Sequence, residues 1–553
     1  MGGLELVFLL LVVCVALRVA AERFSVPYAS ALVVAGLAIA LVPGLPTVRI
    51  PPDVIFLVTV PPLLFGGAQV FPLRDLRTEA GAIARLAIGL VLVSAAAVAA
   101  VVRGADSSMP WAAALTLGAI VAAPDSDAAL WAMRSTPLAR TIEAVLEGEG
   151  LLNDAAAVLV YRMAVSTATG AMTSVSQGIA QFIARVAGGT VLGLIVARLS
   201  VPAHRRTRAL PAVASTVSLL TPYAAFISAE ALGASGVLAV VVVGIYSARH
   251  VPQLVDAETR AYIRTMWAVV IFVVESLMFI LVGLELPNVT SSFERSSLGP
   301  MVGIAALVAV SLIVVRMAWV LLGAYVFRGI QERFRGRRPT LLPIRVVSFV
   351  AWAGLRGSDS LMLALSIPLV TLAGNAFPAR DRIVFIAFCV VVISLVVQGP
   401  TIAPLAQRLG VFRDATDEKE EAHARVVALE AGLEVLKEPG VIASTDPELL
   451  RRLRRRGHTR ARRWVGREEQ LRVSHGATSA HLERAPRPEE SALADRRREQ
   501  FRRVQREMLN AERRALLALR DRKEIADEVM RRVQRELDLE ELLIGPMESR
   551  ADE

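Results

Sequence analysis

The sequence predicts an all-α protein that crosses a membrane many times and ends in a charged helical tail. The mean hydropathy of its 553 residues is +0.52, and 54% of them are hydrophobic, more than in an average soluble domain. Apolar windows long enough to span a bilayer recur through the first 410 residues. From about Val411 the composition changes to Arg and Glu, and no further window occurs. We therefore expect a transmembrane domain at 1–410 and a cytoplasmic tail at 411–553.

The apolar windows predict about thirteen membrane-spanning helices. They cover residues 3–21, 26–43, 54–72, 82–102, 109–133, 141–165, 178–200, 209–230, 234–249, 263–286, 299–327, 342–369 and 382–409. Proline interrupts helices, so Pro124 in the fifth window and Gln398-Gly399-Pro400 in the thirteenth predict breaks. No basic segment precedes the first window, which we interpret as a span rather than a cleaved signal peptide.

The distribution of arginine predicts the orientation. Loops after odd-numbered windows hold most arginines, for example at 205–208 and 333–338, whereas loops after even-numbered windows hold few. The positive-inside rule then places the N-terminus outside and the C-terminus in the cytoplasm. An odd number of spans agrees with termini on opposite sides.

The sparse cysteines and histidines exclude several kinds of site. Cys14 and Cys389 lack the spacing of a disulfide framework or a metal site. All six histidines are expected in loops or the tail, so proton handling inside the membrane falls to carboxylates. The sequence has no HExxH signature and no intramembrane Ser–His pair, which argues against an enzyme, and we expect no cofactor. The net charge of +10 does not predict nucleic-acid binding, because topology and anionic membrane lipid account for the arginine clusters.

The sixth window carries the sequence Gly-Glu-Gly-Leu-Leu-Asn-Asp at 148–154. An Asp at the centre of a spanning helix costs about 2.5–3.5 kcal/mol, and such residues usually handle ions. Asp154 offers a hard oxygen ligand beside the Asn153 amide. A buried carboxylate takes up a proton near neutral pH, so H⁺ and a cation compete for it. The alternative is that Asp154 bonds a neighbouring helix.

Glu149 needs a different partner, because it points away from Asp154 on an ideal helix. Arg356 lies in Ala-Gly-Leu-Arg-Gly at 353–357, in the twelfth window. Its flanking glycines permit close packing or local unwinding. We therefore predict a structural Glu149–Arg356 ion pair between two helices.

Asp125 follows Pro124 midway through the fifth window. Broken spans in transporters expose carbonyls and helix-end dipoles to the substrate. Asp125 would either assist the cation or bond the freed amides of a half-helix N-terminus, and we favour the second role.

The tail predicts structure or regulation rather than chemistry. Charged helical periodicity at 492–543 predicts an antiparallel helical pair or a coiled coil, and 418–437 predicts an amphipathic helix ended by Pro439-Gly440. The basic run 451–467, which contains Trp464, is either a membrane-surface segment or a solvated linker.

Three motifs together resemble a known family: 148–154, Gly-Leu-Arg-Gly at 354–357 and Gln-Gly-Pro-Thr at 398–401. They are similar to those of the bacterial monovalent cation–proton antiporters of the sodium/proton exchanger type, over about residues 1–410, and 512–541 resembles their cytoplasmic tail. The resemblance implies thirteen helices, with two inverted six-helix repeats and broken crossing helices. It also implies a dimerisation domain, hence a homodimer, and a mobile core that gives elevator-like alternating access in the plasma membrane.

The resemblance also implies roles for individual residues. Asp154 would bind the transported Na⁺, Li⁺ or K⁺ and the exchanged H⁺, with Asp125 as a second acid. Asn153 matches the branch regarded as electroneutral. Glu149 and Arg356 would form the core ion pair.

Two positions depart from the family pattern. Pro124 and Gly150 stand where the family has Thr and Ser, so two oxygen ligands are missing. Candidate accessory groups are Ser126, Asp127, Glu275 and Asp359. One hypothesis is that the three acids among them compensate for the missing ligands; the other is that each bonds nearby backbone or lines water.

The sequence leaves two rival functions open. The first is K⁺/H⁺ exchange regulated by the tail, because Na⁺ and K⁺ both use oxygen ligands. The second is a transporter-derived sensor or scaffold without transport. A protein of that second class would have lost the key charges, yet Asp154, Glu149 and Arg356 are all present.

Overall fold

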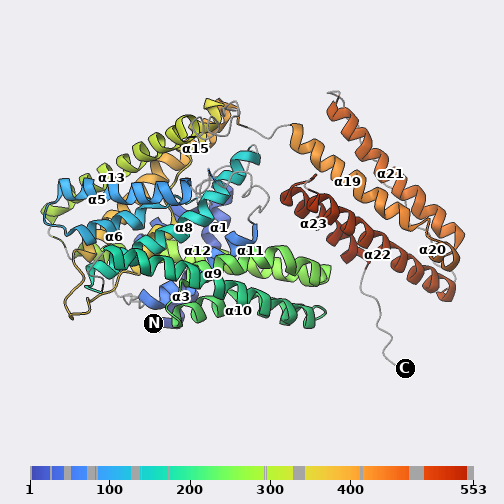
Figure 1. Ribbon diagram of the computed structural model, residues 1–553, viewed down its shortest axis with the longest axis horizontal. Coiled ribbons are helices and arrows are strands. Elements are labelled where there is room, and N and C mark those ends of the chain that lie inside the picture. The colour runs from blue at the N-terminus through green and yellow to red at the C-terminus, as the bar shows by residue number, and fades with distance from the viewer. Residues whose placement is uncertain are drawn as a thin grey trace. The chain divides into compact units, whose positions relative to one another are not determined.

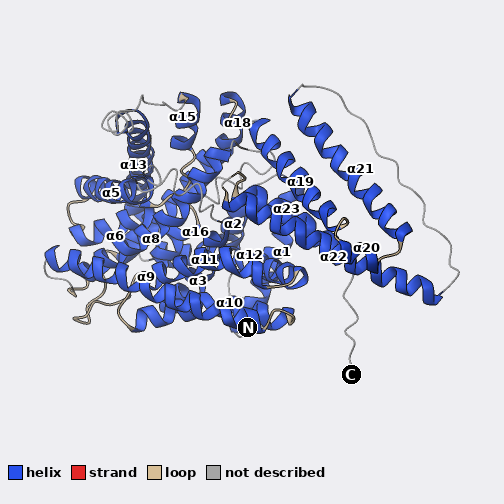
Figure 2. Ribbon diagram, turned by 45° about the vertical axis from the view of Figure 1, so that its right-hand side comes forward, coloured by secondary structure: helices blue, strands red, loops and turns tan. Residues whose placement is uncertain are grey.

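Figure 1 shows the computed structural model of the protein. It describes residues 3–24, 28–42, 52–70, 81, 85–125, 138, 140–171, 175–291, 293, 295–327, 343–411, 415–472, 491–522 and 524–544. Within these ranges the regular elements are helices, and Figure 2 draws no strand. The described residues divide into two compact units, one within 1–412 and the other within 413–553.

The first unit is built from apolar helices. They are α1 (Gly3–Phe24), α2 (Tyr28–Ala40), α3 (Pro52–Val70), α5 (Val91–Ala105), α6 (Trp111–Ala122), α8 (Arg140–Ala168), α9 (Val175–Arg206), α10 (Pro211–Ala231), α11 (Gly236–Leu254), α12 (Ala257–Ser291), α13 (Arg295–Leu321), α15 (Ile344–Trp352), α16 (Ser358–Leu365), α17 (Arg380–Ile393) and α18 (Gly399–Leu409). Three π-helical turns adjoin them: η1 (Arg85–Leu90), η2 (Leu322–Phe327) and η3 (Ser394–Gln398).

Among the described residues, 7 helices are long and apolar enough to cross a membrane, and four shorter apolar helices accompany them. The prediction of an all-helical polytopic membrane protein is confirmed. The count of thirteen membrane-spanning helices and the two inverted six-helix repeats stay predictions.

Helix packing separates the first unit into two bundles. In the core bundle, α5, α6 and α8 pack together, and α13 and α15 to α18 pack with them. In the flanking bundle, α12 packs on α2, and α11 packs on α3, α9 and α10. Contacts between the bundles are sparser. They involve mainly α12 with α16 and α17, α3 with α8 and α16, and α11 with α8.

Two helices of the core bundle are interrupted. Helix α6 ends at Ala122, its C-cap residue Ala123 is extended, and the chain is non-helical up to Asp125. Residues 353–357 separate α15 from α16. The break expected at 398–400 is instead the π-helical turn η3, through which α17 continues into α18. A π-helical turn absorbs an extra residue without ending the helix, so Pro400 lies in the first turn of α18.

The histidine prediction is wrong at two positions. His204 lies in the last turn of α9 and His250 lies in α11, and both helices count among the candidate spans. Each ring is hydrogen-bonded through Nδ1 to the carbonyl oxygen one turn earlier, at Ser200 and Tyr246. Both residues lie near a helix end, where the apolar windows ended too early.

The second unit is a helical assembly with its own apolar core. Its helices are α19 (Ala415–Val435), α20 (Pro439–Ser444), α21 (Pro447–Arg472), α22 (Ser491–Asp521) and α23 (Asp527–Ile544). Helix α19 packs on α21, α22 and α23, so the periodic segment 492–543 forms two helices that cover a third. Trp464 lies under the guanidinium of Arg425, whose Cζ is 4.2 Å from the ring centroid. This contact places Trp464 against α19.

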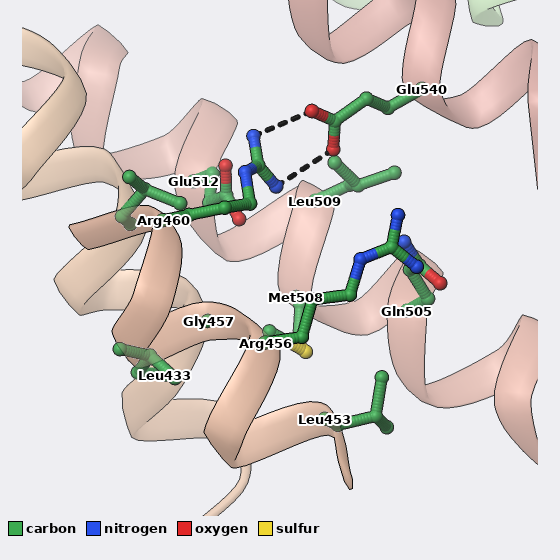
Figure 3. A pocket seen from close by; sticks show the side chains of 11 residues that line it. Leu433, Leu453, Arg456, Gly457, Arg460, Gln505, Met508, Leu509, Glu512 and Glu540 are labelled. Carbon is green, nitrogen blue, oxygen red and sulfur yellow. Dashed lines mark hydrogen bonds and ion pairs between the residues drawn. The ribbon is translucent and has the colours of Figure 1, made fainter. Parts of the chain in front are cut away.

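A small pocket lies among the helices of the second unit (Figure 3). Arg460 of α21 and Glu540 of α23, which both line this pocket, form a bidentate ion pair. The distances are 2.9 Å from Nη1 to Oε2 and 2.5 Å from Nη2 to Oε1. Glu512 of α22 lines the same pocket and is only 2% exposed.

Candidate functional site

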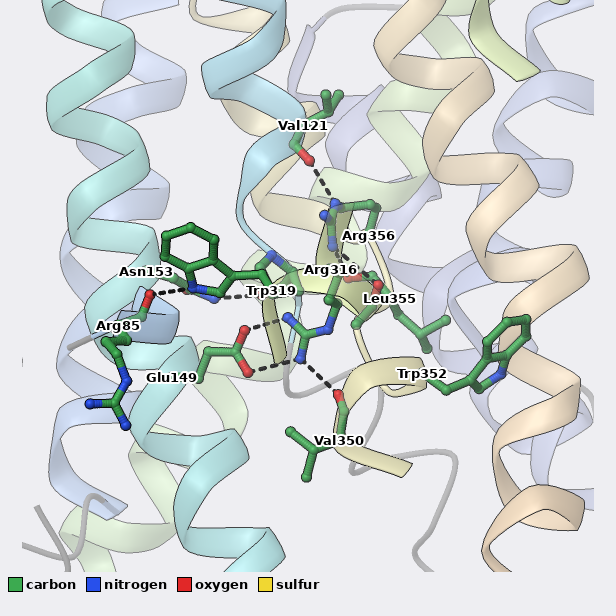
Figure 4. Close-up of polar contacts among 12 residues, drawn as sticks. Arg85, Val121, Glu149, Asn153, Arg316, Trp319, Val350, Trp352, Leu355 and Arg356 are labelled. Atoms are coloured by element: carbon green, nitrogen blue, oxygen red, sulfur yellow. Dashed lines mark hydrogen bonds and ion pairs between the residues drawn. The ribbon is translucent and has the colours of Figure 1, made fainter. Parts of the chain in front are cut away.

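The buried carboxylate of Glu149, on α8, is held by Arg316 of α13 (Figure 4). Arg316 donates from both terminal nitrogens, and the Nη2–Oε2 distance is 2.8 Å. The side chains are 2% and 1% exposed, so this pair is removed from solvent. Nη2 also donates to the carbonyl oxygen of Val350 in α15 over 3.1 Å. One ion pair therefore ties three helices of the core bundle together.

The predicted partner of Glu149 was Arg356, and the structure replaces it with Arg316. The sequence contained a signal for this pairing, because Arg316 interrupts an apolar run. Placing an arginine there costs as much free energy as placing Arg356 in its own window. Periodicity along one helix cannot choose between two arginines on other helices. The choice depends on which guanidinium the packing brings to α8.

Arg356 instead bonds carbonyl oxygens at the end of a broken helix. Its Nε donates to Val121 of α6 over 2.6 Å, and its Nη1 donates to Gly354 over 3.1 Å. Val121 lies in the last turn of α6, where carbonyls lack helical partners and the dipole is negative. Arg356 therefore caps α6 where the helix stops. In the part of the chain that the structure describes, its guanidinium bonds carbonyls rather than Asp359.

The two interrupted segments cross and bond to each other. The backbone N–H of Asp125 donates to the carbonyl oxygen of Leu355 over 2.7 Å. The Asp125 carboxylate lies against Gly357, because a Cβ added to Gly357 would be 1.6 Å from its Oδ2. Gly357 is the N-cap residue of α16, whose positive dipole end favours a carboxylate. The Asp125 carboxylate therefore lies at a half-helix N-terminus, and the bonding of freed amides there stays a prediction.

Gly354 makes room for Arg316 in the same segment. A Cβ added to Gly354 would be 2.3 Å from Nε and 2.4 Å from Cδ of Arg316. A side chain at 354 would therefore push the guanidinium out of reach of Glu149. The glycines of the Gly-Leu-Arg-Gly motif each admit a charged side chain, Arg316 at one end and Asp125 at the other.

Asn153 connects α8 to the break in α6. Its Nδ2 donates to the carbonyl oxygen of Pro124 over 3.1 Å, and the side chain is 0% exposed. Its Oδ1 is buried and makes no hydrogen bond to the described residues. Asp154 follows on the same helix and is partly buried. The arrangement brings the Asn153 amide to the unwound end of α6, and Asp154 is the next residue of α8.

The Gln-Gly-Pro-Thr motif supports the other unwound segment. Ser394 accepts a hydrogen bond from the backbone N–H of Arg356 at 2.9 Å and donates to Oε1 of Gln398 at 3.2 Å. Nε2 of Gln398 donates to the carbonyl oxygen of Trp352, the last residue of α15. The π-helical turn η3 carries both Ser394 and Gln398. The third motif thus replaces backbone hydrogen bonds that α15 loses when it ends, and Ser394 is a residue that the sequence analysis missed.

Of the four accessory candidates, the structure describes Asp359 and Glu275. Asp359 lies in the first turn of α16, and Glu275 lies in α12 of the flanking bundle; both are partly buried. Both take part in polar or electrostatic interactions. Ser126 and Asp127 lie outside the described residues.

The chain is similar to proteins of known class. A family model described as "Sodium/hydrogen exchanger, transmembrane" matches residues 8–408. The chain is 29% identical to an uncharacterised Na⁺/H⁺ exchanger of Mycobacterium tuberculosis, over 99% of this chain and 97% of the relative. It is 27% identical to the sodium, potassium, lithium and rubidium/H⁺ antiporter of Bacillus subtilis, over 80% of this chain and 68% of the relative. The solved structure of the sodium proton antiporter MjNhaP1 of Methanocaldococcus jannaschii matches with a TM-score of 0.57 and 18% identity, over 73% of this chain and 98% of that chain.

The family match spans all three motifs and both interrupted helices, and the likeness to MjNhaP1 shows the same fold. The resemblance drawn from the motifs is confirmed. This chain belongs to the transmembrane sodium/hydrogen exchanger family.

Proposed function

We propose that this protein is a secondary antiporter that exchanges Na⁺, or Li⁺ or K⁺, for H⁺ at Asp154. The supporting observation is the crossing of the interrupted helices, which Asn153 joins to α8 through Pro124. Asp154 follows Asn153, whose Oδ1 adds a second hard oxygen of the kind that alkali cations prefer. Relatives support the ion class, since the Bacillus subtilis protein is described as an antiporter of sodium, potassium, lithium and rubidium.

The charges around the crossing support the choice of Asp154, rather than Glu149, as the site of the exchanged ion. Glu149 and Arg316 neutralise each other, so neither requires a transported ion. Arg356 caps the negative end of α6, and Asp125 lies at the positive end of α16. A single carboxylate that binds either one H⁺ or one monovalent cation gives electroneutral exchange. An empty, charged Asp154 crosses the membrane poorly, because an isolated charge in a low-dielectric interior is costly.

The two-bundle packing supports an elevator-type movement. The crossing, Asp154 and Asn153 all belong to the core bundle, whose helices pack closely on one another. The flanking bundle packs within itself and touches the core bundle through fewer contacts. We propose that the core bundle moves against the flanking bundle, which forms the homodimer contact. Two inverted repeats of six helices, thirteen helices in all, would supply the symmetry of the two end states.

The decisive experiment is cation-dependent dequenching of a pH-sensitive dye in proteoliposomes, with Na⁺, Li⁺ and K⁺ compared. We expect exchange with at least one of these ions and its loss in Asp154→Asn. Asp381→Asn is the matched control, because it makes the same change at an exposed carboxylate. Exchange that survives Asp154→Asn would refute the assignment of the ion site. Wild-type protein that exchanges none of the three ions would instead favour the sensor or scaffold.

A further inference from the structure

A second ion pair lies on the helix that carries Asp154. Arg162 is eight residues further along α8, about 12 Å along the helix axis. Its Nη1 bonds Oε2 of Glu230 over 2.5 Å, and the two side chains are 25% and 28% exposed. Glu230 belongs to α10, a helix of the flanking bundle. This pair therefore joins the two bundles.

Glu230 is held in place from its own side. Its Oε1 accepts a hydrogen bond from the backbone N–H of Gly236 over 2.9 Å, at the start of α11. The turn before Gly236 contains Gly233 in the left-handed region, with φ of 71°. The carboxylate thus closes the α10–α11 turn with one oxygen and offers the other to Arg162.

Arg162 also contacts a third helix of the flanking bundle. Its Cζ lies 4.9 Å from the ring centroid of Phe56 in α3, within the range of a cation–π interaction. The Phe56 ring packs against Phe226 of α10 with centroids 5.9 Å apart. The guanidinium therefore sits in a recess formed by a carboxylate and an aromatic ring, both anchored in the flanking bundle. A partly buried, doubly supported contact of this kind exceeds an exposed ion pair in strength.

The predicted orientation places this contact on the external side. The sixth and eighth windows both run outward, and Arg162 and Glu230 lie near their outer ends. A movement of α8 relative to α10 and α3 would separate the guanidinium from both partners at once.

We propose that Arg162 and Glu230 form a latch that holds the external ends of the two bundles together and keeps Asp154 closed to the outside. This inference rests on the proposed exchange by movement of the core bundle. The latch biases the protein towards the state that opens to the cytoplasm. Removing it raises the population of the outward-open state, and a ligand binds more tightly in proportion to the population of the state that accepts it.

The test measures exchange in proteoliposomes with the cation supplied to one known face at a time. In Arg162→Gln and Glu230→Gln we expect the KM for external cation to fall by about fivefold, without a fall in the KM at the cytoplasmic face. Arg162→Lys retains the charge and should stay close to wild type. A shift confined to one face distinguishes a change in the equilibrium between states from a general loss of folded protein, which lowers the maximal rate alone.

Asp106→Asn is the matched control. Asp106 bonds Arg382 of α17 over 2.6 Å, and the side chains are 22% and 32% exposed, similar to those of the proposed latch. That pair joins elements within the core bundle, so its loss should not change the KM at either face. The latch would be overturned if both Gln variants had an unchanged KM for external cation while exchange still required Asp154. The proposed function would then stand. Wild-type protein without exchange would instead overturn the function on which the latch rests.

Discussion

The side-chain amide of Asn153 donates to the carbonyl oxygen of Pro124 over 3.1 Å, at the point where α6 has lost its helical hydrogen bonds. Pro124 is buried, so this carbonyl needs a partner within the protein. The bond also fixes the neighbouring Asp154 relative to the unwound end of α6. The residue that the family resemblance associates with electroneutral exchange thus has a structural task of its own.

Asn153→Ala should weaken both the fold around the break in α6 and the binding of the cation. It leaves a buried carbonyl without its donor, a loss of about 1–3 kcal/mol, and removes an amide oxygen beside Asp154. We expect the KM for the preferred cation to rise by about tenfold or more. The cation dependence of exchange in proteoliposomes measures this change. Unchanged KM values would contradict a role for Asn153 at the ion site.

Glu149 should be more strongly coupled to Arg316, its hydrogen-bonded partner, than to Arg356. Breaking a buried ion pair by removing one partner costs about 3–5 kcal/mol, because the other charge stays buried. Glu149→Gln and Arg316→Gln should each lower the melting temperature of the purified protein, and the double variant should lose much less than the sum of the two. The same cycle with Arg356→Gln serves as the control and should show a smaller coupling, because Arg356 bonds carbonyl oxygens rather than Glu149. A larger coupling with Arg356 would restore the pairing that the sequence suggested.

Gly354→Ala should destabilise the protein through Arg316. The new Cβ would lie 2.3 Å from the Arg316 Nε, so the guanidinium or the backbone must shift. Such overpacking costs about 1–3 kcal/mol. Gly303→Ala in α13 is the control, because a Cβ at that position meets nothing within 4 Å. Equal melting temperatures for the two variants would show that the segment adapts without cost.

The tail unit should lose stability as pH rises through neutrality, because of Glu512 (Figure 3). Burial raises the pKa of this carboxyl from 4.5 to about 7; Arg460 and Arg513 lower it, and Glu540 raises it. The Glu512 side chain also packs on Gly432 of α19, where an added Cβ would be 2.7 Å from Oε1. The folded state therefore holds the proton more tightly than the unfolded state does.

Because the folded state has the higher affinity for this proton, Glu512 stabilises the folded tail unit at low pH and not at high pH. The stabilisation is complete below the unfolded pKa of 4.5 and is lost as pH rises through about 7, by about 3 kcal/mol in total. Hydrogen exchange of α22 in the full-length protein should accelerate between pH 5 and 7 by more than the intrinsic exchange rate does, and Glu512→Gln should reduce this excess. Glu507→Gln changes a carboxylate that is 44% exposed on the same helix and should leave the pH dependence as it is. A wild-type pH dependence in Glu512→Gln would assign the effect to another group.

Much of the fold could be predicted because membrane insertion imposes a simple rule on sequence. Apolar runs of about 20 residues mark spans, and a change to Arg and Glu near Val411 marks the start of a different unit. The ends of the apolar runs predicted the ends of the helices less reliably. His204 and His250 lie inside helices because a helix continues past the point where its residues turn polar. Likewise, Pro400 does not interrupt the continuous helical segment 380–409, since the π-helical turn η3 before it accommodates the proline.

The sequence by itself determined where the exceptional charges lie, since a charge in an apolar span is costly enough to be recognised without a structure. It singled out Asp154, Glu149 and Arg356 in this way. Only the tertiary structure decided how the charges are shared, because Arg316 and Arg356 carry the same group and differ only in what the packing brings within reach. Arg316 meets Glu149 beside Gly354, and Arg356 meets the carbonyl oxygen of Val121.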